Sequence, residues 1–339
     1  MAFEKKSHYK EVLMDAIIDI AKENDKVVFL DADLSSCIGS TAFEKVFPER
    51  FFNCGIAEAN MVGVAAGLAS TGMVPFVHSF GCFASRRVYD QLFLSVGYTH
   101  QTVHVIGSDP GITAQYNGGT HMPFEDIALM RQIPNMAIVE PSDDYSLYML
   151  TKAVYENGTS SYIRTPRKGI NSIYCDGEEI KLGKAKVLRE GDDVAIISLG
   201  AHLVTESLKA YDILKEQGVN ATVIDLLSIK PMDEETILEV AKKCGKVLVC
   251  ENGRYAGGVG EGIASLLAKN YPCLMDFICV GERFGEVGNL KYLASAFGFT
   301  ADNIAAKALS LAKKWQLVLA QLLDNYLSRL MIILLQRLH

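Results

Sequence analysis

Short apolar segments with the length of buried strands alternate with amphipathic helical segments along most of this 339-residue chain. The alternation runs through several cycles from residue 10 to residue 164, and it resumes from residue 194 to residue 280. Strands that alternate with helices at this spacing form a parallel sheet that helices cover on both faces. The sequence therefore predicts an α/β protein with two three-layer domains, with a parallel sheet in the first and a mostly parallel sheet in the second.

The boundary between the two domains is predicted from a polar stretch in which the alternation stops. Residues 167–192 are rich in glycine, lysine and aspartate, and we read them as a linker between a first domain, 1–166, and a second domain, 193–314. Residues 315–339 are very apolar, but polar and charged residues interrupt them, so they are a poor membrane span. They are expected to form an amphipathic helix that packs on this chain or on a partner, with a reading-frame artefact as the alternative.

Charge and cysteine content exclude several classes of function. The net charge is −7 and no block of five or more Lys or Arg residues occurs, so a nucleic-acid partner is not expected. The eight cysteines form no C-x-x-C pair and no cluster with zinc spacing, so we expect no metal site on this chain and a reducing compartment. The N-terminus lacks the apolar segment of a signal peptide. These features predict a cytoplasmic protein without a membrane partner.

Glu58 begins a predicted helix directly after a strand-like segment. A carboxylate at this end of a helix is ordinary by itself, because the helix dipole favours negative charge there. The context makes it a candidate: residues 62–68 are small and allow another subunit to approach closely. Residues 79–83 follow the end of the next strand, where α/β proteins bind ligands, and residues 117–121 lie in a long glycine-rich loop.

These segments resemble motifs of transketolases and, more distantly, of 1-deoxyxylulose-5-phosphate synthases and the beta chains of 2-oxo-acid dehydrogenases. The resemblance covers about residues 5–312 and rests on several motifs in the same order: GIAEANMVGVAAGLA, FVHSFGCFASRRVYDQL, NGGTHMPFEDIALMRQIPNM, YIRTPR and FGEVGNLKYLASAFG. It implies a pyrimidine-binding domain with the thiamine-diphosphate-binding fold, followed by a transketolase C-terminal domain. It also implies that thiamine diphosphate is the cofactor.

The resemblance assigns cofactor-binding roles to four residues. Thiamine diphosphate reacts through a carbanion at C2 of its thiazolium ring, and the cofactor's own imino group forms that carbanion only when a carboxyl group exchanges a proton with the pyrimidine N1′. Glu58 matches the family position for this carboxyl group. Phe83 matches an aromatic residue that stacks on the aminopyrimidine, with Phe80 beside it, although both could be ordinary core residues. Asp33 matches a cofactor-proximal acid, and a turn-capping role explains it equally well.

Substrate-binding roles follow from the same resemblance. His121 matches a catalytic histidine that hydrogen-bonds substrate hydroxyls near the reacting carbon. Arg164 matches an arginine that binds the substrate phosphate, which suits the paired donors of a guanidinium. Arg86, next to Arg87, lies where it could bind the same anion, with a surface charge as the alternative. Ser108, at the start of the glycine-rich loop, is counted with the substrate-binding residues.

Asn117 departs from the family pattern. Many transketolases carry Gly-Glu-Asp-Gly before the histidine motif, and the aspartate binds a substrate hydroxyl, whereas residues 115–118 here are Gln-Tyr-Asn-Gly. An asparagine side chain both donates and accepts hydrogen bonds, whereas a carboxylate only accepts them. A ketose other than the usual sugar phosphates, or a modified sugar, is therefore expected as a substrate.

The chain lacks the Gly-Asp-Gly motif with which a full transketolase binds the diphosphate and a divalent metal. Gly-Asp-Asp at 191–193 lies in the linker, and the glycine run at 257–260 is interpreted as a point of tight packing. We therefore expect an N-terminal transketolase subunit to supply the diphosphate site and its Mg²⁺ or Ca²⁺. The two kinds of chain would form a heterotetramer that shares the cofactor at its interfaces.

The main hypothesis is the transfer of a two-carbon ketol unit from a ketose phosphate or a related sugar to an aldose, as in pentose phosphate metabolism. A 1-deoxyxylulose-5-phosphate synthase-like enzyme and a 2-oxo-acid dehydrogenase beta chain are alternatives with the same cofactor logic. A non-catalytic structural subunit is an alternative of another class, and the presence of Glu58, Phe83 and His121 argues against it.

Overall fold

A seven-stranded sheet with the order β10-β5-β6-β4-β3-β1-β2 forms the middle layer of the first unit in this computed structural model, which describes residues 6–169 and 171–313. Strands β1 to β6 run parallel, whereas β10 comes from the second unit and pairs antiparallel with β5. The strands are β1 (Val27–Asp31), β2 (Phe51–Asn53), β3 (Val74–Phe80), β4 (His104–Ser108), β5 (Ala137–Val139), β6 (Ser161–Thr165) and β10 (Ser228–Lys230).

Strand β1 shows why helices cover both faces of this sheet. All of its residues are buried: Val27 and Phe29 pack with α1 and α6, whereas Val28 and Leu30 pack with α4, η3 and α5. Successive strand side chains point to opposite faces, so a continuous apolar run requires cover on both. The helical elements are α1 (Tyr9–Glu23), α2 (Ser35–Ile38), α3 (Thr41–Val46), η1 (Pro48–Arg50), α4 (Glu58–Ser70), η2 (Arg86–Val88), η3 (Gln91–Tyr98), η4 (Gly111–Asn117), η5 (Gly119–His121), α5 (Asp126–Arg131) and α6 (Asp144–Glu156).

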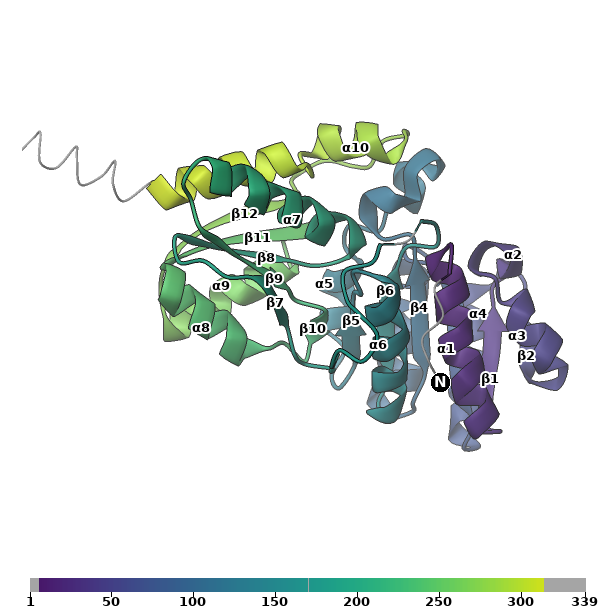
Figure 1. Ribbon diagram of the computed structural model, residues 1–339. Helices are drawn as coiled ribbons and strands as arrows, with labels where there is room; N and C mark the ends of the chain where they lie inside the picture. The colour runs from purple at the N-terminus through teal and green to yellow at the C-terminus, as the bar shows by residue number, and fades with distance from the viewer. Residues whose placement is uncertain (1–5, 170, 314–339) are drawn as a thin grey trace, which may run out of the picture.

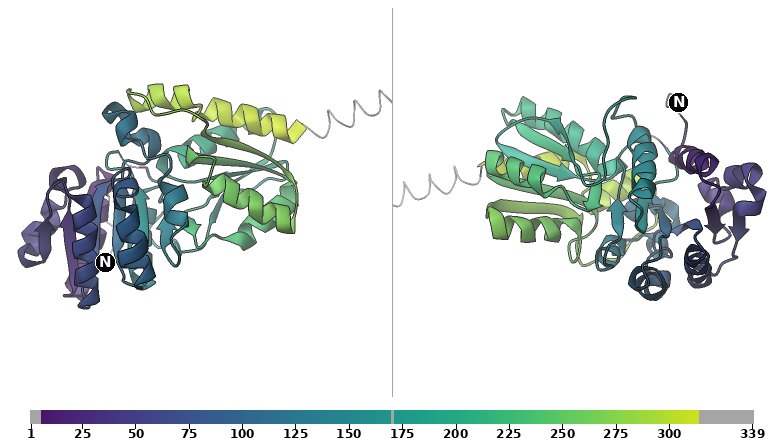
Figure 2. Two further views of the ribbon diagram at one scale, coloured as in Figure 1. Left: turned by 180° about the vertical axis from the view of Figure 1, so that it is seen from behind. Right: turned by 90° about the horizontal axis from the view of Figure 1, so that it is seen from below.

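The second unit is built around a five-stranded sheet with the order β12-β11-β8-β9-β7, in which only β7 is antiparallel to its neighbour. Helices α8 and α9 cover one face, and α7 with helical residues 301–313 covers the other (Figures 1 and 2). The elements are β7 (Lys186–Arg189), β8 (Val194–Ser198), α7 (Ala201–Glu216), β9 (Ala221–Asp225), α8 (Glu234–Cys244), β11 (Lys246–Arg254), α9 (Val259–Asn270), β12 (Leu274–Val280) and α10 (Leu290–Phe297).

Two α/β units with mostly parallel sheets confirm the predicted fold class. The first sheet is not wholly parallel, because β10 joins its edge from the second unit. Strand β7 lies inside the segment predicted as a linker, 167–192, and the residues between β3 and β4 form two separate helical elements, η2 and η3. The predicted helical tail, 315–339, lies outside the described residues. None of the helices within residues 6–169 and 171–313 is long and apolar enough to cross a bilayer.

The glycine run at 257–260 provides the tight packing that its sequence predicts. A side chain at Gly258 would meet the Glu251 carboxylate at 2.5 Å, and one at Gly260 would meet the Phe277 ring at 2.7 Å. The backbone N–H groups of Val259 and Gly260, at the start of α9, donate to the two oxygens of Glu251. A buried side chain of the same chain therefore occupies the helix N-terminus that a phosphate loop would leave free.

Candidate active site

Glu58 is the first residue of α4, and its side chain is buried at the end of the sheet where β1 and β3 terminate. Arg87 donates through Nη1 to both carboxylate oxygens, at 3.0 and 2.9 Å, and the Ser79 hydroxyl lies 3.4 Å from Oε1. The first turn of the helix also favours a negative charge at this position. The carboxylate is thus held in place by a half-exposed arginine and a helix N-terminus.

Three rings gather beside this carboxylate, and we call Phe80, Phe83 and His121 the aromatic cluster. The His121 ring lies 5.2 Å from Phe83 and 5.6 Å from Phe80, centroid to centroid, and both contacts are edge-to-face. The guanidinium of Arg87 lies 4.2 Å from the centre of the Phe83 ring. Arg87 therefore links the Glu58 carboxylate directly to the aromatic cluster.

A tight turn after β3 sets the position of Phe83. The backbone N–H of Phe83 donates to the carbonyl of Phe80 at 2.8 Å, and that of Gly81 donates to Ser108 at 2.7 Å. A Cβ atom at Gly81 would lie only 2.7 Å from the ring of Pro123, so the turn can approach the neighbouring loop only with glycine at this position.

The loop that carries Asn117 and His121 is anchored in the second unit. Ile112, Ala114, Met122 and Phe124 from this loop belong to a buried cluster that otherwise consists of second-unit residues. A Cβ atom at Gly119 would lie 2.5 Å from the carbonyl oxygen of Gly285, so the backbones of these two residues are in close contact. The segment that carries His121 is therefore packed directly against the second unit.

Arg164 does not reach the site, and its assignment to a substrate phosphate is wrong. Its side chain is fully buried, with Nε on Asp126 and Nη1 on Glu140, both at 2.8 Å. Its Nη2 donates to the carbonyls of Pro123 and Asn252, and the latter lies on β11 of the second unit. Because Arg164 is buried in a strand that is covered on both faces, it joins the two units and a substrate anion cannot reach it.

Arg167, three residues further on, does reach the aromatic cluster. It follows the end of β6, and its guanidinium lies 4.9 Å from the centre of the Phe80 ring. Its Nε and Nη2 both donate to one oxygen of Asp109, at 2.9 and 2.5 Å. The sequence does carry a signal for this: the alternation of strands and helices ends at residue 164, so the second arginine of the YIRTPR motif lies beyond it, whereas the first lies within it.

Three other expected residues lie apart from the aromatic cluster. Ser108 is fully buried and its hydroxyl pairs with His78 at 3.0 Å, so a substrate cannot reach that side chain and the assignment is corrected. Arg86 is exposed and forms an ion pair with Glu125 at 2.8 Å, whereas its neighbour Arg87 contacts Glu58 and Phe83. Asp33 is exposed at the end of β1, where it accepts a hydrogen bond from Asn53 at 3.0 Å.

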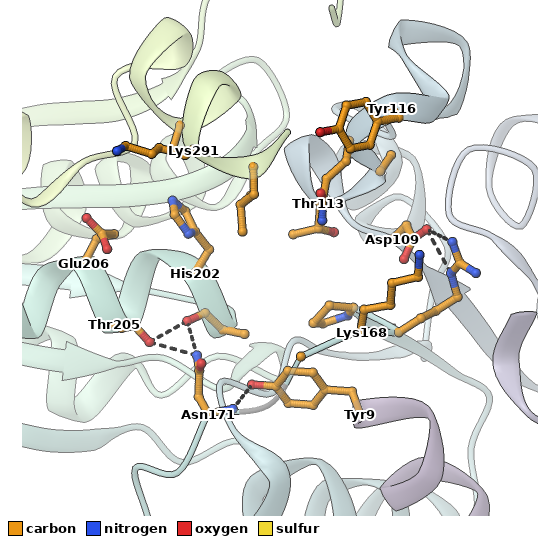
Figure 3. Close-up of a pocket in the computed structure, with 18 of the residues that line it drawn as sticks. Tyr9, Asp109, Thr113, Tyr116, Lys168, Asn171, His202, Thr205, Glu206 and Lys291 are labelled. Atoms are coloured by element: carbon orange, nitrogen blue, oxygen red, sulfur yellow. Dashed lines mark hydrogen bonds and ion pairs between the residues drawn. The ribbon is translucent and has the colours of Figure 1, made fainter. Parts of the chain in front are cut away.

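A cavity of about 740 Å³ lies between the two units, next to Arg167 (Figure 3). The first unit contributes η4 and the residues after β6, and the second contributes α7 and α10. This volume is in the range of small-molecule sites. Charged and polar residues on its wall include Asp109, Asn117, Lys168, His202, Glu206 and Lys291.

Comparison with known proteins identifies the family. Residues 5–171 match the model of the transketolase pyrimidine binding domain, and residues 183–304 match that of the transketolase C-terminal domain. The chain is 43% identical over 299 residues to the 6-deoxy-6-sulfo-D-fructose transketolase subunit SqwH of Clostridium sp. (strain MSTE9), covering 88% of this chain and 92% of that protein. The chain belongs to the transketolase family. It has the two domains of the C-terminal subunit of a split transketolase.

Two further comparisons support this transketolase assignment. A solved structure described as a split gene transketolase, inactive beta4 tetramer, is 34% identical with a TM-score of 0.84, and the match covers 91% of this chain and 99% of that one. The 1-deoxy-D-xylulose-5-phosphate synthase 1 of Geobacter sulfurreducens is 36% identical over 303 residues, which cover 88% of this chain but only 47% of that protein. The transketolase subunit thus corresponds to about half of a single-chain relative of this kind.

The residues of the transketolase site fit the pyrimidine half of thiamine diphosphate. The cluster offers a buried carboxylate at Glu58 for a ring nitrogen, and Phe83, which is partly exposed, presents a ring on which an aminopyrimidine could stack. Within residues 6–169 and 171–313, no group of three or more His, Cys, Asp or Glu side chains could hold a metal ion.

Proposed function

We propose that this chain is the pyrimidine-binding subunit of a two-chain, thiamine-diphosphate-dependent enzyme that moves a two-carbon ketol unit from a ketose to an aldose. The observation that carries the proposal is the buried Glu58 carboxylate beside the aromatic cluster, in which the His121 ring lies 5.2 Å from the Phe83 ring. In the reaction the C2–C3 bond of the ketose breaks and a bond from C2 to the acceptor's aldehyde carbon forms. The donor's C3 hydroxyl loses a proton and the acceptor's aldehyde oxygen gains one, so no oxidant is required.

Glu58 is proposed to hold the proton at N1′ of the aminopyrimidine. Thiamine diphosphate, when bound, supplies a nucleophilic carbon at C2 of its thiazolium ring. Arg87 must move before Glu58 can bind the cofactor, because its guanidinium covers Phe83 and occupies both carboxylate oxygens. The Arg87 side chain is 47% exposed, so it can move out into solvent when the cofactor binds.

His121 and Asn117 are proposed to bind the hydroxyl groups of the sugar. His121 is partly exposed at the aromatic cluster, and its Nδ1 lies 2.9 Å from the Thr120 hydroxyl, which leaves Nε2 for a substrate hydroxyl. Asn117 is exposed on the wall of the cavity. Arg167, between the cluster and the cavity, is the candidate for binding the terminal group of the sugar. The substrate named for the Clostridium relative makes 6-deoxy-6-sulfo-D-fructose a candidate donor beside ketose phosphates.

A second chain is proposed to cover the exposed apolar side of α4 and η3, which we call the α4–η3 face. Val64 of α4 is 41% exposed, and Phe93, Leu94 and Tyr98 of η3 are 37%, 48% and 77% exposed. A Cβ atom added at Gly63 or Gly67 would meet no other atom within 4 Å, so the helix backbone is open to close approach. Such an apolar face is typical of a protein interface. The partner would be the N-terminal transketolase subunit, in a heterotetramer, with the diphosphate and its Mg²⁺ or Ca²⁺.

The test is to purify this chain with a subunit that carries the Gly-Asp-Gly motif, add thiamine diphosphate and Mg²⁺, and measure ketol transfer to glycolaldehyde. We expect transfer with the mixture and none with either chain alone. Ketol transfer by this chain alone would refute the two-chain proposal. Release of CO₂ from pyruvate with glyceraldehyde 3-phosphate, without ketol transfer, would instead support a 1-deoxyxylulose-5-phosphate synthase-like reaction.

A further inference from the structure

The ion pair between Asp109 and Arg167 lies where the aromatic cluster meets the cavity between the units. Arg167 contacts Phe80 of the cluster, and both members of the pair line the cavity. The two side chains are only 6% and 12% exposed, for Asp109 and Arg167 respectively, so solvent screens this pair less than a surface pair. Two of the guanidinium N–H groups donate to one Asp109 oxygen. Arg167 can therefore offer a ligand only its remaining N–H groups, and Asp109 neutralises its positive charge.

The charges around this pair add up to one positive charge at this end of the cavity. Asp109 cancels Arg167, and Lys168, the next residue on the wall, has no ion-pair partner among the described residues. Figure 3 shows the Lys168 side chain reaching into the cavity toward Asp109. This end therefore suits a ligand group with a single negative charge.

The opposite wall, on the second unit, carries its own charges. Glu206 pairs with Lys209 at 2.7 Å, and Lys291 lies on the rim. His202 lies between them, and burial lowers the pKa of its imidazole, so the ring is neutral near pH 7. Its Nε2 donates to the carbonyl of Phe299 at 2.8 Å. Among the described residues, Arg167 forms the ion pair with the Asp109 carboxylate, and no charged group of the opposite wall does so.

The backbone holds Asp109 so that its carboxylate stays on Arg167. Its φ angle is 59°, in the left-handed region, and its N–H donates to the carbonyl of Thr165 at 3.1 Å. Aspartate and asparagine tolerate this conformation better than other residues with a side chain. A residue kept in an unusual conformation at a binding site is a reasonable candidate for a functional role.

We propose that Asp109 is a specificity-determining residue, which selects a donor ketose whose terminal group carries one negative charge, such as a sulfonate, over one that carries a dianionic phosphate. The inference rests on the proposed ketol transfer and deepens it. A phosphate carries close to two charges near pH 7, whereas a sulfonate carries one. Relative to a neutral side chain at this position, the Asp109 carboxylate would weaken the binding of an extra negative charge about 5 Å away by roughly tenfold or more.

The test uses three donors that differ only at C6: fructose, fructose with a sulfonate at C6, and fructose 6-phosphate. The assembled two-chain enzyme transfers the ketol unit to glycolaldehyde, which is uncharged, so only the donor's charge varies. We expect the highest kcat/KM with the sulfonate and roughly tenfold less with the phosphate. An equal or higher kcat/KM with the phosphate, or with fructose itself, would overturn the role assigned to Asp109 but not the proposed ketol transfer. Inactivity with all three sugars would refute the proposed ketol transfer, and this inference with it.

Asp109→Asn removes the charge while keeping a residue that tolerates the backbone conformation. We expect this variant to raise the phosphate-to-sulfonate ratio of kcat/KM by roughly tenfold, with an unchanged circular-dichroism spectrum and urea-unfolding midpoint as evidence of folding. The matched control is Asp19→Asn, which removes a carboxylate from the surface of α1. An unchanged ratio in Asp109→Asn would overturn the proposal. Lowering the pH through about 6 protonates the phosphate dianion to a monoanion and should also raise the ratio in the unaltered enzyme, with the sulfonate as the internal reference.

Discussion

Arg87 donates to both carboxylate oxygens of Glu58, at 3.0 and 2.9 Å, from a helical turn that is separated from Glu58 by a complete strand. The same guanidinium lies over the ring of Phe83. In the free chain, the two groups proposed to hold the aminopyrimidine are therefore both in contact with one flexible side chain. Its displacement is the event that would couple cofactor binding to rearrangement of the site.

Glu58→Gln should abolish most of the activity of the assembled enzyme. An amide cannot hold and return the proton at the pyrimidine nitrogen, so we expect kcat to fall by about 10²- to 10⁴-fold in the ketol-transfer assay. The matched control is Glu234→Gln, at the exposed first position of α8, which should leave kcat unchanged. Full activity of Glu58→Gln would show that the proposed role is wrong.

Arg87→Ala should make the free chain less stable and bind the cofactor more tightly once the enzyme is assembled. The substitution leaves the buried Glu58 carboxylate without its ion-pair partner, and we expect the free energy of unfolding to fall by about 1–3 kcal/mol. The cofactor no longer has to displace the arginine, so its Kd should decrease in a titration. The neighbouring Arg86→Ala, whose partner Glu125 lies elsewhere, should change neither quantity. Equal Kd values for the two variants would contradict the displacement.

Replacement of the two arginines of the YIRTPR motif should give different results. Arg164→Met leaves Asp126 and Glu140 buried without a positive charge, and we expect a loss of about 3–5 kcal/mol in the free energy of unfolding. Arg167→Met should cost far less stability and should instead raise KM for an anionic donor. Urea unfolding of the free chain and kinetics of the assembled enzyme measure the two effects. If Arg164→Met were fully stable but had a raised KM, the proposal that Arg167 rather than Arg164 binds the substrate anion would be wrong.

Glu251 should make the protein less stable as the pH rises. Burial raises the pKa of its carboxyl group to about 7, from an ordinary value of 4.5, although Val259 and Gly260 donate to it. The contribution of this group is complete below the unfolded pKa and is lost as the pH rises through the folded pKa, because the folded state binds the proton more tightly. From about pH 4 to about pH 8 we expect Glu251 to account for roughly 3 kcal/mol of lost stability.

Urea unfolding of Glu251→Gln over that pH range provides the measurement. The variant should lose this part of the pH dependence, whereas Glu239→Gln, at an exposed position on α8, should retain it. Identical pH profiles for the two variants would place the Glu251 pKa close to its ordinary value.

Val64→Asp should prevent assembly with the partner subunit without unfolding the free chain. The substitution places a charge in the middle of the α4–η3 face, where it would be desolvated in a complex. Val46→Asp on α3 is the matched control, because that valine is 50% exposed and lies outside this face. Size-exclusion chromatography of each variant with the partner reports assembly. A complex that forms equally well with both variants would show that the partner binds elsewhere.

The resemblance of the motifs proposed several candidate positions, and their roles stay predictions. Glu58 at the start of α4 and Phe83 after β3 are two of these, and the structure places both next to Arg87. Choosing between Arg86 and Arg87 required the three-dimensional fold, because the segment forms a short turn followed by a π-helix, and the regular spacing of an α-helix does not apply.

Other features depended on contacts between distant segments. The apolar pattern of β6 could have indicated that Arg164 is buried, but its partners come from α5, the end of β5 and β11. Strand β10 is three residues long and completes the sheet of the other unit, which no local pattern reveals. Asp109 was not singled out from the sequence, since only the fold brings Arg167 to it.

The contact between Gly119 and Gly285 has a consequence for engineering and for gene rearrangement. The loop that carries His121 is seated on a segment about 165 positions later in the chain. Chimeras that take the first domain from one relative and the second from another would combine a His121 loop with a second-domain segment whose packing surface did not evolve with it. Such hybrids could fold and still misplace the histidine, so grafting a new sugar preference onto this scaffold means moving residues 111–124 and 284–289 as one cassette.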